Sequence, residues 1–230
     1  MNQPEAYADG SYTVLLAGVV GSRAYGMATP ESDEDRLGVV LLPTQALIGL
    51  DAPKDTWAST SPDVTMHELG KFLRLALKAN PTILDLLWLD EYDVRHPAGD
   101  VLVERRADYL STDAVRRAFG GYAMDQARAL QRRGDPRSPE SRKRIAKHAR
   151  HCFRALRQGE ELLRTGTMSL RVPNRDELFA LGDSPVDEIV ARFHEAFAQF
   201  SRTPSILPET ADRAAVNALV LDLRHRYGAS

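Results

Sequence analysis

Two short apolar runs near the start of the chain predict buried strands. They are Val14–Val20 and Leu37–Leu42, and continuous apolar runs of this length are typical of strands covered on both faces. Residues 63–68 alternate between polar and apolar side chains, which predicts a third strand. The clusters of Gly, Pro and Ser at 30–32 and 52–62 predict a tight connection and a longer loop.

From Leu69 onward the apolar positions recur every three or four residues, which predicts helices. The first of them is expected to end at Asn80-Pro81, because proline disfavours helical geometry in the residue before it. Residues 83–89 are largely apolar and leave helix and strand open. Residues 168–182 are predicted to hold a short strand and a loop. The other predicted helices span residues 98–109, 112–132, 139–164, 185–200 and 210–226.

Serine, proline and glycine mark several of the predicted helix ends. Ser138 and Ser184 each precede a proline, and a serine cap before a first-turn proline is typical of a helix start. Gly134, Gly166 and Gly228 stand where glycine commonly follows the last helical turn.

These patterns divide the 230 residues into an α/β core at residues 1–95 and a helical lobe at residues 96–230. Hydrophobic residues make up 43% and charged residues 27%, as in ordinary globular proteins. The single cysteine, Cys152, excludes an intramolecular disulfide and fits a reducing compartment. Because we find neither a signal peptide nor an apolar run of membrane-spanning length, we expect a cytoplasmic protein that does not bind membranes.

The segment between the first two predicted strands, GSRAYGMATPESDED, combines residue types that phosphate chemistry needs. Asp33 and Asp35 share a face if the chain is extended. Two such close carboxylates repel each other unless a cation lies between them, and Mg²⁺ favours carboxylates together with substrate phosphates. Gly21 lets a phosphate approach the backbone, and Ser22 adds a hydroxyl at a predicted helix start. Turn chemistry alone explains either motif, but their combination between two buried strands favours a nucleotide site.

The run GSRAYGMATPESDEDRLGVV resembles the signature of the DNA polymerase beta-like nucleotidyltransferase superfamily. The wider sequence is similar to a bacterial and phage branch called predicted nucleotidyltransferases, through DVTMHELGKFLRLALKANPTILDLLWL, FGGYAMDQ and KHARHCFRALRQGEELLRTG. The resemblance implies an α+β fold, with a small mixed sheet in an α/β nucleotidyltransferase core and a mainly helical C-terminal lobe. Glu34 departs from the pattern, since many relatives have an apolar residue there, and it must reach solvent or a cation.

The resemblance also implies a mechanism. A nucleoside triphosphate binds with its phosphates at Gly21 and Ser22, a hydroxyl attacks the α-phosphorus, and pyrophosphate leaves. Two Mg²⁺ ions, for which Mn²⁺ can substitute, would bridge the phosphates and the carboxylates of Asp33 and Asp35.

In the superfamily a third carboxylate, from a neighbouring strand, helps to hold or deprotonate the attacking hydroxyl and binds metal. Asp63 is the candidate here because it opens the predicted strand 63–68, and Glu68 is the rival. Strand alternation places the two on opposite faces, so only one can face the site. Arg23, directly after the Gly-Ser turn, is either a phosphate contact or a surface arginine.

Positive charge is concentrated in residues 128–157, although the whole chain has a net charge of −2. This segment holds eleven Lys and Arg residues and two acidic residues, a net charge of +9. Lys147, His148 and His151 resemble a Lys-His…His motif of the family, which would contact the triphosphate or the acceptor. Three interpretations stay open: a solvated basic face, a triphosphate contact, and a groove for an RNA backbone.

Three functions fit these observations. The first is Mg²⁺-dependent transfer of a nucleoside monophosphate from an NTP to a hydroxyl, such as an RNA or tRNA 3′ end in RNA repair. The second is a toxin–antitoxin nucleotidyltransferase that modifies a protein or tRNA, and the third is a non-catalytic nucleotide or RNA sensor. The paired Asp33 and Asp35 favour an enzyme, because a sensor does not need two such close carboxylates.

Overall fold

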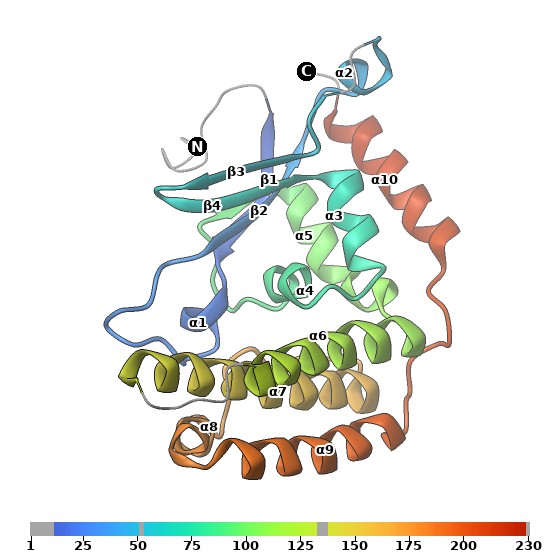
Figure 1. Cartoon of the computed structure of the whole chain (residues 1–230). Helices are drawn as coiled ribbons and strands as arrows, with labels where there is room; N and C mark the ends of the chain where they lie inside the picture. Colours follow the sequence, from blue (N-terminus) through green and yellow to red (C-terminus); the bar gives the residue numbers. More distant parts are fainter. Residues whose placement is uncertain (1–11, 51–52, 133–137, 229–230) are drawn as a thin grey trace. The chain divides into compact units, whose positions relative to one another are not determined.

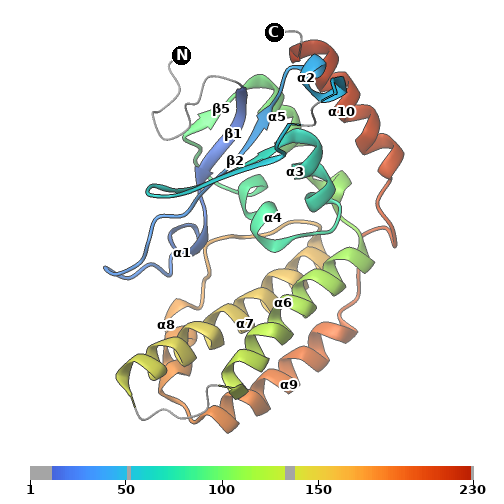
Figure 2. The same cartoon turned by 45° about the horizontal axis from the view of Figure 1, so that its top comes forward.

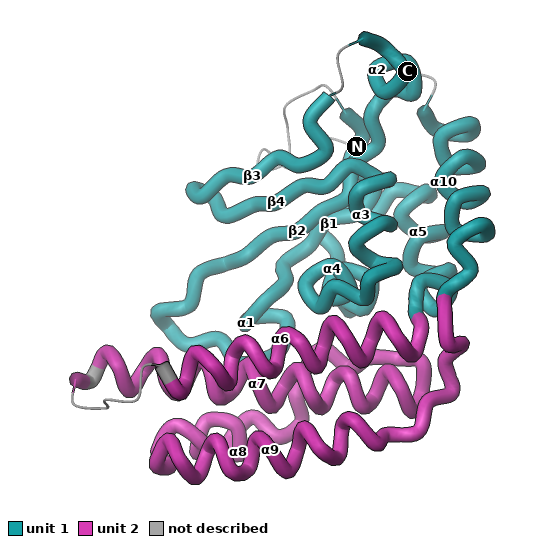
Figure 3. The backbone as a smooth tube through the Cα atoms, turned by 45° about the vertical axis from the view of Figure 1, so that its right-hand side comes forward, with its two compact units in different colours: residues 1–110, 211–230 teal, residues 111–210 magenta. Residues whose placement is uncertain are grey.

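The computed structural model describes residues 12–50, 53–132 and 138–228. The chain divides into two compact units, shown in different colours in Figure 3. The sheet unit comprises Met1–Leu110 and Ala211–Ser230, and the helical unit comprises Ser111–Thr210. The boundary predicted at residue 95 differs from this division, because residues 96–110 and the C-terminal segment belong to the sheet unit.

The sheet unit is built on a mixed sheet with the strand order β3-β4-β2-β1-β5 (Figures 1 and 2). β2 and β4 are parallel, and the other neighbours are antiparallel. β1 and β2 are buried along most of their length, as their continuous apolar runs predict. The strands are β1 (Thr13–Val19), β2 (Arg36–Leu41), β3 (Thr56–Thr60), β4 (Asp63–Glu68) and β5 (Val94–Arg95).

Helices of the sheet unit pack on these strands. α3, α4 and α5 contact the sheet, and α10 contacts α3. The ambiguous segment 83–89 is helical for most of its length, since α4 begins at Pro81 and Asn80 caps it by accepting a hydrogen bond from the Ile83 N–H at 3.3 Å. The helices are α1 (Gly21–Ala24), α2 (Thr44–Ile48), α3 (Leu69–Ala76), α4 (Pro81–Leu87), α5 (Pro97–Glu104), the 3₁₀ turn η2 (Arg106–Tyr109) and α10 (Arg213–Tyr227).

The predicted loop at 52–62 is wrong for half of its described residues, because β3 lies within it. This strand has no alternating apolar pattern, since its residues after Trp57 are exposed at the edge of the sheet. Trp57 lies 5.2 Å from Tyr12, measured between ring centroids, and both rings pack on a small cluster. The buried members of the cluster are Val14, Ala17, Val40, Val64 and Met66.

The helical unit consists of three longer helices and short connecting elements. α6 and α7 pack along each other, and α9 packs against both. The predicted helices 112–132, 139–164 and 185–200 are confirmed to within two residues at each end. The elements are α6 (Thr112–Arg132), α7 (Pro139–Thr165), α8 (Arg175–Ala180), the 3₁₀ turn η3 (Leu181–Asp183) and α9 (Val186–Arg202).

The short strand predicted within residues 168–182 is wrong: the described residues there form an extended segment, α8 and η3. Every second residue of the extended segment is buried, as in a strand. These residues are Met168, Leu170 and Val172. The backbone of Ser169 bonds to side chains of α7 instead of to a strand. Its N–H donates to Glu161 at 3.1 Å, and its carbonyl accepts from the Gln158 amide at 3.3 Å.

The predicted helix ends have different outcomes. Ser138 caps α7 as predicted, and Gly166 ends it in the left-handed conformation, with φ +69°. The predicted serine cap at Ser184 is wrong, because no side chain caps α9. Gly228 follows α10 but has φ −97°, which any residue can adopt. Gly134 lies outside the described residues.

The mixed sheet and the helical C-terminal part confirm the predicted α+β fold class. Among the residues that the structure describes, no helix is both long enough and apolar enough to cross a membrane.

Candidate active site

The Gly-Ser turn follows β1 and is held by its own backbone. Gly21 has φ +69° and begins α1, which is a single turn of four residues. Behind it, the Met27 N–H donates to the Ser22 carbonyl at 2.9 Å, and the Gly26 N–H donates to the Arg23 carbonyl at 3.0 Å. The sequence predicts a helix N-terminus here, which is a natural site for an anion. One turn carries little of a helix macrodipole, so this short helix adds little positive charge to attract a phosphate.

Asp35 lies directly against this turn. A Cβ atom at Gly21 would lie 2.4 Å from Asp35 Oδ2, closer than any real contact of that kind. The Val20 N–H also donates to the Asp35 carbonyl at 2.9 Å. The structure thus joins the Gly-Ser and Asp-x-Asp motifs at one place, and residue 21 must be glycine both for its φ and for the space that Asp35 occupies.

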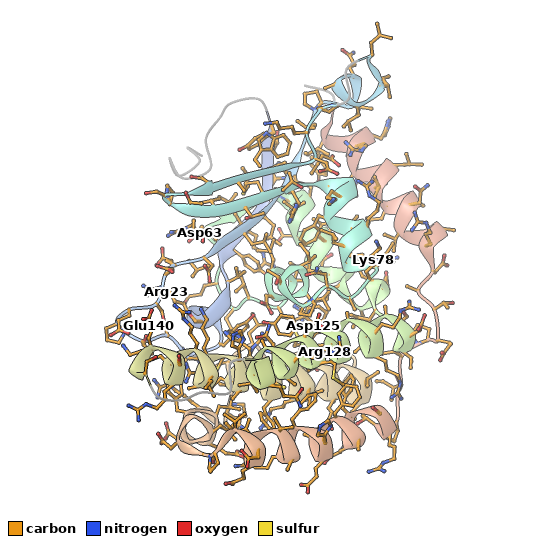
Figure 4. The ribbon with its side chains drawn as sticks, in the orientation of Figure 1. Arg23, Asp63, Lys78, Asp125, Arg128 and Glu140 are labelled. Carbon is orange, nitrogen blue, oxygen red and sulfur yellow. The ribbon has the colours of Figure 1, made fainter. Side chains whose placement is uncertain are left out.

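The register of the sheet relates Asp35 to Asp63. β2 and β4 run parallel with Arg36 opposite Val64, and Asp35 and Asp63 each directly precede one of these two paired residues. Asp33 and Asp63 are exposed, and Asp35 is half-buried. Asp33 and Asp35 precede β2, so ideal strand alternation does not apply to them. Figure 4 shows Asp63 at the β3–β4 hairpin.

The aspartates can hold a metal only together with other ligands. In the described part of the chain, no group of three His, Cys, Asp or Glu side chains is arranged to hold an ion. Mg²⁺ usually takes one or two carboxylates, with water and substrate phosphates as its remaining ligands. The carboxylate of Asp35 against Gly21, with Asp63 at the start of the neighbouring parallel strand β4, fits such a partial site.

Glu68, the rival third carboxylate, is engaged elsewhere. It is 4% exposed, on the same side of β4 as the buried Val64 and Met66. It forms an ion pair with Arg224 of α10 and accepts a hydrogen bond from the Gly70 N–H at 2.7 Å. Glu68 therefore joins β4, α3 and α10.

Glu34 finds a cation, as its position between two aspartates requires. It pairs with Arg23 at 3.5 Å and with Arg36, and Arg36 also lies 3.4 Å from Asp93. Arg23 follows the Gly-Ser turn on α1 (Figure 4), and its side chain is 47% exposed. Its guanidinium therefore neutralises Glu34 in this structure, and a phosphate would compete with Glu34 for it.

A buried hydrogen bond links the Gly-Ser turn to α4. Tyr25, which caps α1, donates its hydroxyl hydrogen to Asp85 of α4, and the two residues are 4% and 1% exposed. Neither residue was predicted to have a functional role. The available signal was a charged residue within the apolar run ILDLL, since a buried carboxylate requires a polar partner.

The predicted binding residues Lys147, His148 and His151 all belong to α7 in the helical unit. Lys147 is exposed, and His148 Nδ1 lies 2.7 Å from Gln126 Oε1. Burial, followed by the positive charges of Arg154 and Lys147, lowers the pKa of His151 to about 3. His151 is therefore a neutral imidazole at physiological pH.

Comparisons with known proteins support a nucleotidyltransferase. No curated protein matches the chain. Among the solved structures that match is a nucleotidyltransferase-like protein from Exiguobacterium sibiricum 255-15, with 9% identity, a TM-score of 0.33, and coverage of 96% of this chain and 76% of that chain. So distant a likeness carries no functional weight. The profile of the RNA repair pathway DNA polymerase beta family (RlaP), however, matches residues 4–200. The chain therefore belongs to this family of nucleotidyltransferases.

Proposed function

We propose that the protein transfers a nucleoside monophosphate from a nucleoside triphosphate to a hydroxyl group, with Mg²⁺ held by Asp33, Asp35 and Asp63. The observation that carries this proposal is the carboxylate of Asp35 lying directly above Gly21. A phosphate that approaches the backbone at Gly21 meets the Asp35 carboxylate. Two negative groups this close need a cation between them, and Mg²⁺ suits oxygen ligands of both kinds.

In this proposal each group of the turn has one task. The backbone at Gly21 and the Ser22 hydroxyl orient the phosphates, while Asp33 and Asp35 supply metal ligands. The attacking hydroxyl oxygen bonds to the α-phosphorus, the bond to the bridging oxygen breaks, and pyrophosphate leaves. Asp63 holds the hydroxyl and takes its proton. Bound Mg²⁺ would stabilise the negative charge that develops on the phosphoryl oxygens.

We further propose that the acceptor is an RNA end, because the family is described by an RNA repair pathway. Lys147, His148 and Arg23 are then candidates for contacts with the triphosphate or the RNA. Neutral His151 would contribute a hydrogen bond rather than a charge, since its pKa lies near 3.

The test is a transfer assay with the full chain, Mg²⁺ and each α-labelled NTP, offered with RNA, with protein extract, or with no acceptor. Asp33→Asn, Asp35→Asn and Asp63→Asn are compared with Asp90→Asn, an exposed aspartate of the same unit that serves as the matched control. We expect label on RNA, a loss of at least about 10³-fold in the first two variants, and no loss in the control.

The other outcomes lead to different conclusions. Label on protein would show that the acceptor is a protein and not RNA. Full activity of Asp63→Asn would remove Asp63 from the site. An absence of label under every condition, with NTP binding retained, would refute the transferase reaction and favour a nucleotide sensor.

A further inference from the structure

The helical unit contains a pocket that includes none of the predicted site residues. Its volume is about 390 Å³, and it lies between the C-terminal half of α7, the segment that follows this helix, and α9. Pockets that enclose small ligands measure about 300–1,000 Å³, so this one has room for a single nucleotide. Its lining includes Arg157, Glu160, Glu161 and Arg164 of α7, Pro173, and Gln199 of α9.

The two arginines of the pocket are available to a ligand. Arg157 and Arg164 are exposed and two helical turns apart, so both face the same side of α7. Neither forms an ion pair within residues 12–50, 53–132 and 138–228. Arg144 of the same helix, by contrast, pairs with Glu140 at 3.0 Å. An unpaired guanidinium binds phosphate oxygens through two parallel N–H groups.

The two glutamates limit how much negative charge the pocket accepts. Glu161 is engaged, since its oxygens accept from the Ser169 hydroxyl at 2.6 Å and from the Ser169 N–H at 3.1 Å. Glu160 forms no ion pair among the described residues. Together with Arg157 and Arg164 they make the lining neutral. A triphosphate, with about four negative charges, is therefore disfavoured relative to a phosphodiester with one.

The remaining lining residues suit a nucleobase. The exposed ring of Pro173, next to the buried Val172, presents an apolar surface, against which the face of a base can pack. Glu160 and the exposed Gln199 offer acceptors and a donor for the polar edge of a base. Unpaired bases of single-stranded RNA are recognised through such contacts to their faces and edges.

We propose that this pocket seats one nucleotide of a single-stranded RNA and so forms an acceptor-binding site on the helical unit. The proposal rests on the proposed function only in treating the bound strand as the acceptor. Binding itself can be measured without any transfer reaction.

The experiment measures the affinity of the full chain for a short, fluorescently labelled single-stranded RNA by anisotropy, over a range of salt concentrations. The variants are Arg157→Gln, Arg164→Gln and Gln199→Trp, which fills the pocket without changing charge. Arg192→Gln on α9 and Gln45→Trp on α2 are matched controls, because both side chains are exposed and outside the pocket.

We expect each pocket arginine variant to weaken RNA binding about tenfold, since each removes a charge-assisted contact. The slope of the logarithm of the binding constant against the logarithm of the salt concentration should become shallower by roughly 0.7 for each lost phosphate contact. Gln199→Trp should weaken binding without changing the salt dependence, and both controls should bind like the unaltered chain.

Two results would overturn the proposal. If Arg192→Gln weakens RNA binding as much as Arg157→Gln, the effect is general electrostatic attraction and the pocket is not a site. If the pocket variants weaken binding of a free fluorescent NTP as much as binding of RNA, the pocket is a site for free nucleotides. The Asp35→Asn transfer assay tests the proposed function separately, because it leaves the pocket unaltered.

Discussion

The sheet unit and the helical unit hold their charged residues by different means. In the sheet unit, a backbone hydrogen bond from Val20 and the contact with Gly21 hold Asp35. In the helical unit, cations follow one another along α7, and their neighbours decide which are available. Arg154 is buried against Gln158, whereas Arg157 is exposed. The position of a residue in a motif held by backbone contacts can therefore be inferred from the sequence. For a run of charged residues, the sequence does not show which side chains are exposed.

Gly21 and Gly166 allow the most direct test of this comparison. Both have φ +69°, but a Cβ at Gly21 would lie 2.4 Å from Asp35, whereas at Gly166 the nearest atom is 3.7 Å away. Gly21→Ala should lower kcat/KM for NMP transfer about 10²–10³-fold, because it displaces a carboxylate of the proposed site. Gly166→Ala should cost only about 1 kcal/mol of unfolding free energy. If Gly21→Ala keeps full activity, the contact between Asp35 and Gly21 is not part of the site.

Ion pairs of the two units should differ in their contribution to stability. The side chains of Arg224 and Glu68 in the sheet unit are 12% and 6% exposed. Arg224→Met should lower the unfolding free energy by about 3 kcal/mol, because it leaves a buried carboxylate without its cation. Arg144→Met in the helical unit removes an exposed pair and should cost less than about 0.5 kcal/mol. Urea unfolding followed by circular dichroism measures both, and equal losses would contradict the comparison.

Two tyrosines of the sheet unit with buried hydroxyl groups test the support of the Gly-Ser turn. Tyr25→Phe removes the hydroxyl that donates to Asp85 and should cost about 2 kcal/mol of stability, with a lower kcat because the turn loosens. Tyr92 is the matched control, since its buried hydroxyl has no hydrogen-bond partner among the described residues. Tyr92→Phe should change little. If Tyr25→Phe and Tyr92→Phe change stability and transfer activity equally, the hydrogen bond to Asp85 does not position the turn.

The smallest expected effect is a pH dependence in the helical unit. Burial lowers the pKa of His151 from 6.5 to about 3, so the unfolded chain binds this proton more readily than the folded chain. Stability is therefore complete above about pH 6.5 and decreases as the pH falls toward 3, by roughly 1.5 kcal/mol between pH 6.5 and 5. His151→Leu should remove that part of the decrease. An unchanged pH profile of urea midpoints would show that His151 is not the responsible group.

Local sequence patterns predicted the central strands of the sheet unit. The apolar runs at Val14–Val20 and Leu37–Leu42 became β1 and β2, because a strand buried on both faces has little choice of side chain. The Gly-Ser and Asp-x-Asp motifs were recognisable because both lie on one short connection. β3 was missed because an edge strand with exposed polar residues has no apolar period, and its pairing with β4 depends on its partner.

The hydrogen bond between Tyr25 and Asp85 and the ion pair between Glu68 and Arg224 could not be predicted from sequence. Their partners are 60 and 156 residues apart, and no local period relates them. The same limit applies to the alternately buried Met168, Leu170 and Val172. The backbone of Ser169, which lies between them, bonds to side chains of α7 and not to a neighbouring strand.

The sequence by itself indicated the family and predicted where on the chain its chemistry lies, because Gly21, Ser22, Asp33 and Asp35 are close neighbours whose residue types suit phosphate and metal. Only the tertiary structure decided which carboxylates and cations are available. It placed Asp35 and Asp63 directly before Arg36 and Val64, which lie opposite each other in the parallel strands β2 and β4, and it paired Glu68 with Arg224. It also left Arg157 exposed at a pocket. Burial and pairing depend on what the rest of the chain brings to a residue, and no local pattern contains that information.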